Sequence, residues 1–459
     1  MVYIAIDIGS TYIKSSLLSP QTGEILNRNR IAVNPKIEQA NSFRFEVDMR
    51  ELLVSVRTIL DGYISARKDI AGILFSTQQH GFVYTTPTST QDRYISWQDS
   101  RCLEPLDANG ETTLSLLQKQ ISVEEMRPTG VYLKPALGLC NLYALIREQG
   151  GVPQGAKLYT LGSYLIEKLT GNNVCHVTNA APLGLADIFS GCWYDALIQK
   201  LGFEAIELPR LTCEMEICGY YETHGQRIAV YPDTGDVQTS VLGGGALEGD
   251  VTVNMATAGQ VCMIHKIPSI GSGDPRYYEI RPYFDGLYCH TISRMPSGRN
   301  LDVLVELIAE IGRHVFGKSL SCTEIWAKLA QCGSGMDTQG LAVDTSFYEQ
   351  PEKLADGSIV HITRANLTLE NLFSAAYQDM GRVYAHYIRM MENAVGQKPN
   401  RMIFCGGAVR NNPMIRSALE HTVGLPSMLS VSADEVHEGM MQLARKIDVQ
   451  NERIRRKSE

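Results

Sequence analysis

The sequence contains 11 cysteines, but none forms a CxxC pair or stands near histidine in zinc-finger spacing. A dispersed, odd number of cysteines fits free thiols in a reducing compartment. No stretch approaches the roughly 20 apolar residues that are needed to span a bilayer. Asp7 interrupts the apolar start of the chain, so we expect no signal peptide. These absences predict a cytoplasmic protein with no membrane partner.

Positive charge is also scarce. The chain has 42 Lys and Arg against 50 Asp and Glu, a formal net charge of −8. A general nucleic-acid binder would show a basic stripe, so we expect no nucleic-acid partner. The basic tail at 451–459 fits a solvated helix end. The sequence contains neither a GxxxxGK[ST] P-loop nor a GxGxxG dinucleotide fingerprint.

What is present is enough chain for two domains: 459 residues, of which 44% are hydrophobic. Apolar runs and helical spacing alternate along it, which predicts an α/β fold in two domains, 1–242 and 243–450, with a cleft between them. We expect strands at 2–8, 12–19, 25–33, 71–75, 228–231, 250–254, 260–265 and 402–405. We expect helices at 48–66, 135–149, 160–169, 300–315 and 368–394, with a further helix starting near Asn411.

The first stretch with candidate chemistry is DIGSTYIK, residues 7–14. A glycine beside a strand end lets backbone N–H groups approach an anion, and the hydroxyls of Ser10 and Thr11 add donors. Lys14 reaches the same region from the next strand, and Asp7 is suited to holding Mg²⁺ on a nucleotide. The alternative for this stretch alone is an ordinary polar turn.

The second stretch is GDVQTS, residues 235–240, where Asp236 stands at an expected helix start. It acts either as a helix cap or as a general base that accepts a proton from an attacking hydroxyl. Two further glycine-containing loops follow strands: MATAG at 255–259 and CGGAVRNNP at 405–413. The strand–loop–strand pattern at 2–19 is echoed at 250–265, which suggests a duplication.

The order of these four motifs resembles the superfamily of sugar kinases, actin and heat-shock chaperone ATPases, and within it the FGGY carbohydrate kinases. The resemblance implies two ribonuclease H-like (actin-like ATPase) domains, with ATP and Mg²⁺ as cofactors. It implies Asp236 as the catalytic base, with Asp7 and Asp236 near the metal. The residues it implies for phosphate and nucleotide are Gly9, Ser10, Thr11, Lys14, Thr257, Ala258, Gly259, Gly298, Gly406, Gly407, Ala408 and Asn411. Ala258 stands where many relatives have a hydroxyl residue.

Two further stretches resemble the sugar-reading segments of ketose kinases, STQQHG at 76–81 and YISWQDSRC at 94–102. The second is closest to sedoheptulokinases, as is the stretch 281–301. The resemblance implies phosphorylation of a ketose, with sedoheptulose as the leading substrate. Xylulose, gluconate, a polyol or a non-catalytic ATP-binding module are the alternatives. We expect a monomer or homodimer. The candidate substrate-binding residues are Gln79, His80, Trp97, Asp99, Arg101 and Asp236.

Overall fold

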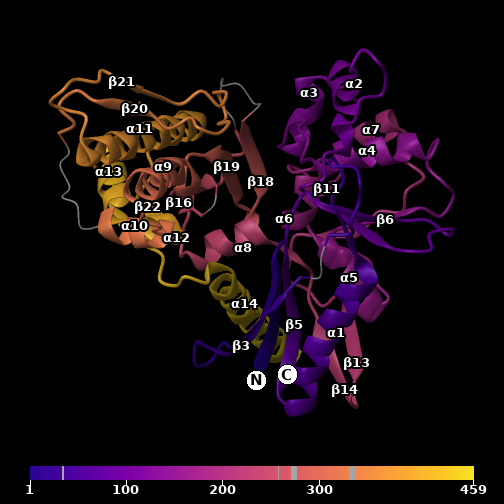
Figure 1. The fold of residues 1–459 in the computed structure, drawn as a ribbon. Coiled ribbons are helices and arrows are strands. Elements are labelled where there is room, and N and C mark those ends of the chain that lie inside the picture. The colour runs from indigo at the N-terminus through magenta and orange to yellow at the C-terminus, as the bar shows by residue number, and fades with distance from the viewer. Residues whose placement is uncertain (34–35, 257, 270–276, 330–336, 459) are drawn as a thin grey trace. The chain divides into compact units, whose positions relative to one another are not determined.

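The computed structural model describes residues 1–458 except 34–35, 257, 270–276 and 330–336. The chain forms two compact units. The first unit comprises Met1–Gly243, Arg281–Tyr288 and Asp434–Glu459, and the second comprises Gly244–Ile280 and Cys289–Ala433. The first unit therefore includes both the start of the chain and its end, coloured indigo and yellow in Figure 1.

The first unit is built on a seven-stranded sheet in the order β13-β14-β5-β1-β2-β3, with β15 paired to β5. All residues of β1 (Val2–Ile8) are buried, as expected for a central strand. It runs antiparallel to β2 and parallel to β5. The other strands are β2 (Tyr12–Ser19), β3 (Glu24–Ala32), β5 (Ile70–Thr77), β13 (Gly219–Thr223), β14 (Gln226–Val230) and β15 (Thr234–Gly235). The strands expected in this part of the sequence are confirmed.

Alternation along β1 divides its side chains between two helices. Ile4, Ile6 and Ile8 join the core beneath α1 (Met49–Ala66), whose apolar face carries Leu52, Val56 and Leu60. Tyr3 and Ala5 point to the opposite face and pack with Met440, Ala444 and Ile447 of α14 (Glu435–Ser458). Successive strand residues face opposite sides, so Asp7 belongs to the face that α14 covers.

Two glycines allow α14 to approach α8 (Asp236–Gly243) very closely. A Cβ atom at Gly243 would lie 1.7 Å from the Glu435 carbonyl oxygen, and one at Gly439 would lie 1.9 Å from that of Thr239. Any side chain at either position would push the helices apart. The segment around Gly439 is thereby held against the middle and the end of α8.

The first unit also contains a four-stranded sheet in the order β4-β7-β6-β8 and two two-stranded sheets. The strands of the four-stranded sheet are β4 (Glu46–Asp48), β6 (Phe82–Thr85), β7 (Arg93–Ile95) and β8 (Lys157–Tyr159). The helices expected at 135–149 and 160–169 are present as α4 (Gly138–Glu148) and α5 (Leu161–Thr170). Leu139, Leu142 and Leu158 lie in the core shared by this sheet and α4.

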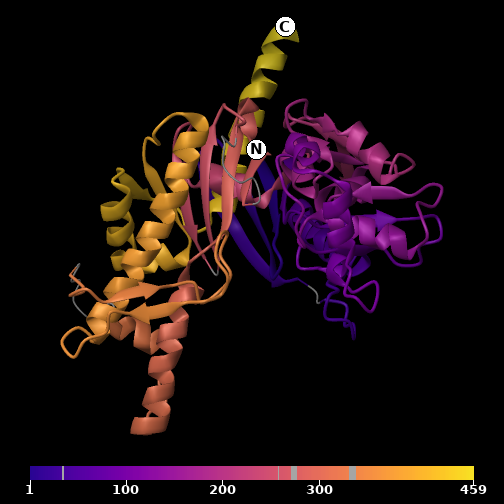
Figure 2. The same ribbon diagram turned by 90° about the horizontal axis from the view of Figure 1, so that it is seen from above.

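The second unit is built on a six-stranded sheet in the order β18-β19-β17-β16-β22-β23. Its long helices are α9 (Gly298–Phe316) and α11 (Leu369–Val395), and α9 projects beyond the sheet in Figure 2. The helix expected to start near Asn411 is confirmed as α13 (Pro413–Val423), which Pro413 begins with Asn412 as its cap. A short helix that was not expected, α12 (Gly407–Asn411), precedes it. The strands are β16 (Val251–Met255), β17 (Gly259–His265), β18 (Tyr278–Pro282), β19 (Tyr288–Met295), β22 (Met402–Cys405) and β23 (Ser427–Leu429).

The predicted echo between the two halves is visible in the strand pairing. β16 runs antiparallel to β17 and parallel to β22, as β1 does to β2 and β5. Each unit thus places a short loop at the end of a central strand. Among the described helices, none combines the length and apolar character that a bilayer crossing requires.

Candidate functional site

Asp7 lies near the end of β1, in register with Lys14 of β2 and Ser76 of β5. Its side chain is almost wholly buried, and Nζ of Lys14 lies 3.5 Å from its Oδ2. Burial raises the pKa of Asp7, while the charge of Lys14 opposes that shift. Gly9 N–H donates to the Tyr12 carbonyl at 3.1 Å, which closes a tight turn with Ser10 and Thr11 exposed at its tip.

Lys14 is shared between two carboxylates. Its Nζ lies 3.5 Å from Oδ1 of Asp434, directly before α14, as well as 3.5 Å from Asp7. Nδ1 of the buried His437 lies 2.8 Å from Oδ2 of Asp434. Burial opposes ionisation of Asp434, but His437, Lys14 and Arg28 outweigh it and lower the pKa of Asp434 to about 2. The end of the chain therefore contributes a permanent negative charge beside the Asp7 turn.

Asp236 is the first residue of α8, immediately after β15. Its Oδ1 accepts a hydrogen bond from the N–H of Val237 at 2.8 Å. Desolvation, followed by the charge of Asp7, raises the pKa of Asp236 to about 7, and the positive charge of Arg281 opposes this shift. A carboxylate with a pKa near neutrality is suited to accepting a proton from a hydroxyl.

The short helix α6 (Val177–Ala180) joins the Gln79 segment to the Asp236 segment. The Thr178 carbonyl accepts from Nε2 of Gln79 at 2.7 Å, and the Thr178 hydroxyl accepts from the N–H of Gly235 at 3.2 Å. Nε2 of Gln79 also donates to Oε1 of Gln238 at 2.7 Å. Gln79 and the start of α8 are therefore fixed to the same backbone, which places a predicted substrate residue next to the predicted base.

Arg281, at the end of β18, enters this group from a distant part of the chain. Its Nη1 donates to Oε1 of Gln79 at 2.9 Å, and its Nη2 lies 3.2 Å from Nε2 of His80. Nδ1 of His80 lies 2.8 Å from the Pro182 carbonyl, so that nitrogen carries the proton and Nε2 accepts from Arg281. His80 has a positive φ of 67°, a strained backbone that tertiary contacts must hold.

The predicted substrate residues of the 94–102 segment divide into two kinds. Trp97 is 41% exposed and available to a ligand. Arg101 is buried, with Nε donating to Oδ1 of Asp99 at 2.9 Å and Nη2 donating to Oε1 of Glu46 at 2.6 Å. Both oxygens of Asp99 are occupied, because Oδ2 also accepts from the Phe45 N–H at 2.8 Å. These contacts support a structural role for Asp99 and Arg101, and the hydroxyl-reading role expected for them stays a prediction.

Within the second unit, three of the predicted nucleotide segments come together. A Cβ at Gly298 would lie 3.5 Å from Cβ of Ala408 and 3.7 Å from the Ala256 carbonyl oxygen. Ser297, which caps α9, donates to that carbonyl at 2.6 Å. Gly406 has a φ of 85°, and a Cβ there would lie 2.6 Å from the Met255 carbonyl oxygen. Only glycine fits at this crossing of loop and strand end.

The remaining residues predicted to bind the nucleotide differ in their exposure. Gly407 and Asn411 are exposed at the two ends of α12, and Ala258 is exposed in the loop before β17. Gly259 faces inward, because a Cβ there would lie 2.1 Å from the Tyr384 hydroxyl. Thr257 lies outside the described residues. Small residues at strand ends and helix starts, with backbone groups accessible, fit an anionic, flat ligand such as a nucleotide.

Sequence reasoning missed Arg281 and Thr178 as parts of this group. Arg281 lies inside the stretch whose resemblance to ketose kinases was noted, and a lone arginine in an apolar run is a usable signal. Thr178 acts through its backbone carbonyl as well as its hydroxyl, so its side-chain type alone carries little information.

Residues 2–245 match the N-terminal domain of the FGGY family of carbohydrate kinases. The chain belongs to the FGGY family. As an FGGY protein, it is 26% identical to the glycerol kinase of Solidesulfovibrio magneticus over 281 residues, 58% of this chain and 53% of that protein. It is 23% identical to the apulose kinase of Pectobacterium atrosepticum over 231 residues, 48% of this chain and 44% of that protein. The chain thus spans about half the length of these relatives.

Solved structures of the family share the fold. The xylulose kinase of Lactobacillus acidophilus superposes with a TM-score of 0.81 at 18% identity, covering 97% of this chain and 89% of that one. The gluconate kinase of the same organism gives a TM-score of 0.81 at 19% identity, with the same coverage. The expected FGGY membership and the two-domain, actin-like α/β fold are confirmed. The named substrates of these relatives differ from one another and do not include sedoheptulose.

Proposed function

We propose that this FGGY protein transfers the γ-phosphoryl group of ATP to a primary hydroxyl of a small ketose or polyol. The observation that carries the proposal is Asp236, a carboxylate at a helix start with a pKa near 7, fixed by α6 beside Gln79 and Arg281. A nucleotide clamp without catalysis has no need of a base at this place, which favours a kinase over a non-catalytic ATP-binding module.

In the proposed reaction, Asp236 accepts the proton of the acceptor hydroxyl as its oxygen attacks the γ-phosphorus. A bond forms between that oxygen and phosphorus, and the bond from phosphorus to the β,γ-bridging oxygen breaks, releasing ADP. Because a pKa near 7 leaves much of Asp236 ionised at neutral pH, the carboxylate is poised to act as the base. Most of the remaining catalysis in phosphoryl transfer is positioning and charge stabilisation.

Gln79, His80 and Trp97 are the proposed contacts for the acceptor. The Trp97 ring offers an apolar plate to a sugar face. The amide N–H groups of Gln79 and both nitrogens of His80 are bonded within the protein, so a second lone pair on Oε1 of Gln79 is the polar group proposed for a hydroxyl, and His80 is proposed to contact the acceptor through its ring. Sedoheptulose stays the first candidate because of the 94–102 segment. Xylulose, gluconate and glycerol are the alternatives that the relatives' names suggest.

Asp7, Lys14 and the Gly9–Thr11 turn are proposed to bind the phosphate end of ATP. Thr257, Ala258, Gly259, Gly298, Gly406, Gly407, Ala408 and Asn411 are proposed to bind the rest of the nucleotide. Asp7 fits a Mg²⁺ site, since this ion is usually held by one or two carboxylates together with substrate phosphates. When bound, Mg²⁺ would neutralise charge that develops on the phosphate oxygens. Asp236 was also predicted near the metal, and its electrostatic coupling to Asp7 supports that proposal.

The test is ADP release by the purified protein with ATP and Mg²⁺, in the presence of sedoheptulose, xylulose, gluconate or glycerol, with mass analysis of the product. The proposal predicts ADP release that depends on one acceptor and a product heavier by one phosphoryl group. Release that is independent of every acceptor, or no release with any, contradicts it.

A further inference from the structure

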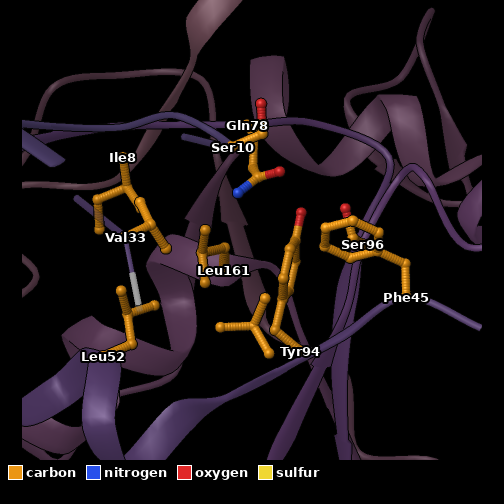
Figure 3. A pocket seen from close by; sticks show the side chains of 10 residues that line it. Ile8, Ser10, Val33, Phe45, Leu52, Gln78, Tyr94, Ser96 and Leu161 are labelled. Carbon is orange, nitrogen blue, oxygen red and sulfur yellow. The ribbon is translucent and has the colours of Figure 1, made fainter. Parts of the chain in front are cut away.

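A small pocket in the first unit lies beneath the Asp7 turn, and the proposed mechanism does not use it. Figure 3 shows Ile8, Val33 and Leu52 at the left of the pocket and the Gln78 amide at its top. The hydroxyls of Tyr94 and Ser96 lie at the right, where Phe45 also lies. Ser10 of the Asp7 turn also borders it. The apolar lining consists of Ile8, Val33, Phe45, Val47, Leu52 and Leu161.

Two buried polar atoms of this pocket are unpaired. Among the residues that the structure describes, the hydroxyl of Tyr94 has no hydrogen-bond partner, and Oε1 of Gln78 has none either. Tyr94 is 1% exposed and Gln78 is 6% exposed, so solvent does not satisfy these atoms. Buried polar groups nearly always have partners, and each exception calls for an explanation.

The surrounding structure holds both groups in place. A Cβ at Gly81 would lie 2.2 Å from the Tyr94 hydroxyl, so only glycine leaves room for the phenol to reach this point. Tyr94 is anchored in β7 between Val47 of β4 and Val83 of β6. Gln78 continues from β5, where its N–H donates to the Ile8 carbonyl at 3.1 Å and its Nε2 donates to the Gly9 carbonyl at 3.4 Å. The free carbonyl oxygen of the amide is thereby the atom left for a ligand.

The two unpaired atoms limit the kinds of chemical group that the pocket can bind. A phenol hydroxyl offers a proton, and an amide oxygen accepts one. A hydroxyl group both accepts and donates, so it satisfies the two atoms together, whereas a carboxylate or phosphate leaves Gln78 unpaired and an ammonium leaves the Tyr94 proton unpaired. The cavity holds about 10 Å³, room for one water-sized group. The site adjoins the proposed acceptor residues, because Gln78 directly precedes Gln79 and the Tyr94 hydroxyl reaches Gly81, the residue after His80.

We propose that this pocket is a specificity subsite that receives one hydroxyl group of the acceptor, with Tyr94 donating a hydrogen bond to it and Gln78 accepting one from it. This proposal rests on the proposed kinase function. It adds Tyr94 and Gln78 as the two residues that select an acceptor with several hydroxyl groups. A site built to hydrogen-bond a hydroxyl rejects the analogue that lacks it, because its own buried groups are then left unpaired.

The experiment compares wild type with Tyr94→Phe and Tyr84→Phe. Tyr84 is the matched control: its hydroxyl is also buried without a partner among the described residues, but it lies outside the pocket lining. Sedoheptulose, xylulose, gluconate and glycerol are measured with each protein by calorimetric binding and by steady-state kinetics. The acceptor that wild type prefers is then measured again as its set of monodeoxy derivatives.

We expect Tyr94→Phe to lower kcat/KM for that acceptor about 10- to 100-fold, mainly through KM, with the KM for ATP unchanged. Tyr84→Phe should match wild type. One monodeoxy derivative should be handled equally by wild type and Tyr94→Phe, because the missing hydroxyl and the missing phenol proton belong to the same contact.

The outcomes separate this proposal from the kinase function. If wild type phosphorylates an acceptor and Tyr94→Phe matches it in KM and in every deoxy comparison, the pocket holds water only and the subsite proposal is overturned while the kinase stands. If wild type binds an acceptor without phosphorylating it, the kinase proposal fails, and the binding loss in Tyr94→Phe still decides the subsite. If wild type binds none of the four, both proposals fail.

Discussion

Nη1 of Arg281 donates a hydrogen bond to Oε1 of Gln79 at 2.9 Å, although the two residues are 202 positions apart in the chain. Both lie in the first unit, because the Arg281–Tyr288 segment packs there. Arg281 is 3% exposed and also contacts His80, so it orders both polar groups that follow β5. Its charge additionally favours the ionised form of Asp236. One side chain thus contacts two proposed acceptor residues and also favours ionisation of the proposed base.

Replacing Arg281 with Met should raise the acceptor KM about 10-fold, since Gln79 and His80 lose a charged hydrogen-bond donor. Loss of the positive charge also raises the pKa of Asp236, so the rise of kcat/KM with pH should move to higher pH. Steady-state kinetics between pH 5.5 and 9 measure both effects. Arg50→Met, on the exposed face of α1, is the control and should leave the profile in place. An unshifted profile in Arg281→Met would contradict the electrostatic link.

Asp236→Asn should lower kcat by about 10²- to 10⁴-fold, the usual contribution of a positioned general base. ATP affinity, measured by calorimetry in the absence of Mg²⁺, should change little because the proposed nucleotide residues are elsewhere. Asp195→Asn is a matched control: it is also an aspartate at the first position of a helix, α7 (Asp195–Leu201), and is exposed. Near-normal turnover in Asp236→Asn would show that Asp236 is not the general base.

Asp7→Ala should raise the Mg²⁺ concentration needed for half-maximal activity, because the proposed metal loses its protein carboxylate. The measurement is a Mg²⁺ titration of ADP release at fixed ATP. Asp69→Ala, which removes an exposed carboxylate paired with Arg67, should give the wild-type curve. Identical curves for Asp7→Ala and wild type would argue against metal binding at Asp7.

The buried carboxyl group of Asp233 should make the stability of the folded protein depend on pH. Burial raises its pKa from 3.8 to about 6, although hydrogen bonds from Thr160 and Asn179 oppose the shift. Between these pH values the folded protein keeps a proton that the unfolded chain has lost, so the contribution of this group to stability falls as pH rises from about 4 to 6. Asp233→Asn does not titrate, so its stability relative to wild type should increase by about 2 kcal/mol between pH 4 and pH 7.

Urea unfolding of both proteins at pH 4, 5, 6 and 7 measures that change. Comparing the difference across pH, rather than at one pH, removes any constant effect of the new amide on packing. Asp195→Asn should show the wild-type slope. Parallel curves for Asp233→Asn and wild type would mean that the Asp233 carboxyl ionises normally in the folded protein.

Arg101→Met should lower the free energy of unfolding by about 3–5 kcal/mol, because Asp99 and Glu46 are left buried without their common cation. If the role of Arg101 is structural, the folded fraction of the variant at low temperature keeps the wild-type KM for the acceptor. A stable variant with a strongly raised KM would instead support the substrate contact that the motif predicts.

Much of the fold follows from local patterns in the sequence. Ile4, Ile6 and Ile8 alternate with Tyr3 and Ala5, so both faces of the sheet at β1 must be buried. The apolar residues of 49–66 recur with the helical period of 3.6 residues, which predicts the helix that covers one of these faces. Asp236 was expected at a helix start, and α8 begins there. The helix start near Asn411 is confirmed by α13, whereas the short helix α12 before it was missed, because its glycine-containing segment was expected to be a loop.

The sequence by itself determined the strand and helix pattern, the family and the position of Asp236, since these depend on periodicity and on short motifs in which neighbours along the chain act together. Only the tertiary structure decided that Arg281 contacts Gln79 and that the Asp434–His437 pair approaches Lys14. It also decided that Arg101 is committed to Asp99 and Glu46, and that Tyr94 and Gln78 share one cavity. Most of these pairings join residues far apart in sequence. All of them depend on which polar groups are buried away from water when the chain folds, and no local pattern encodes that burial.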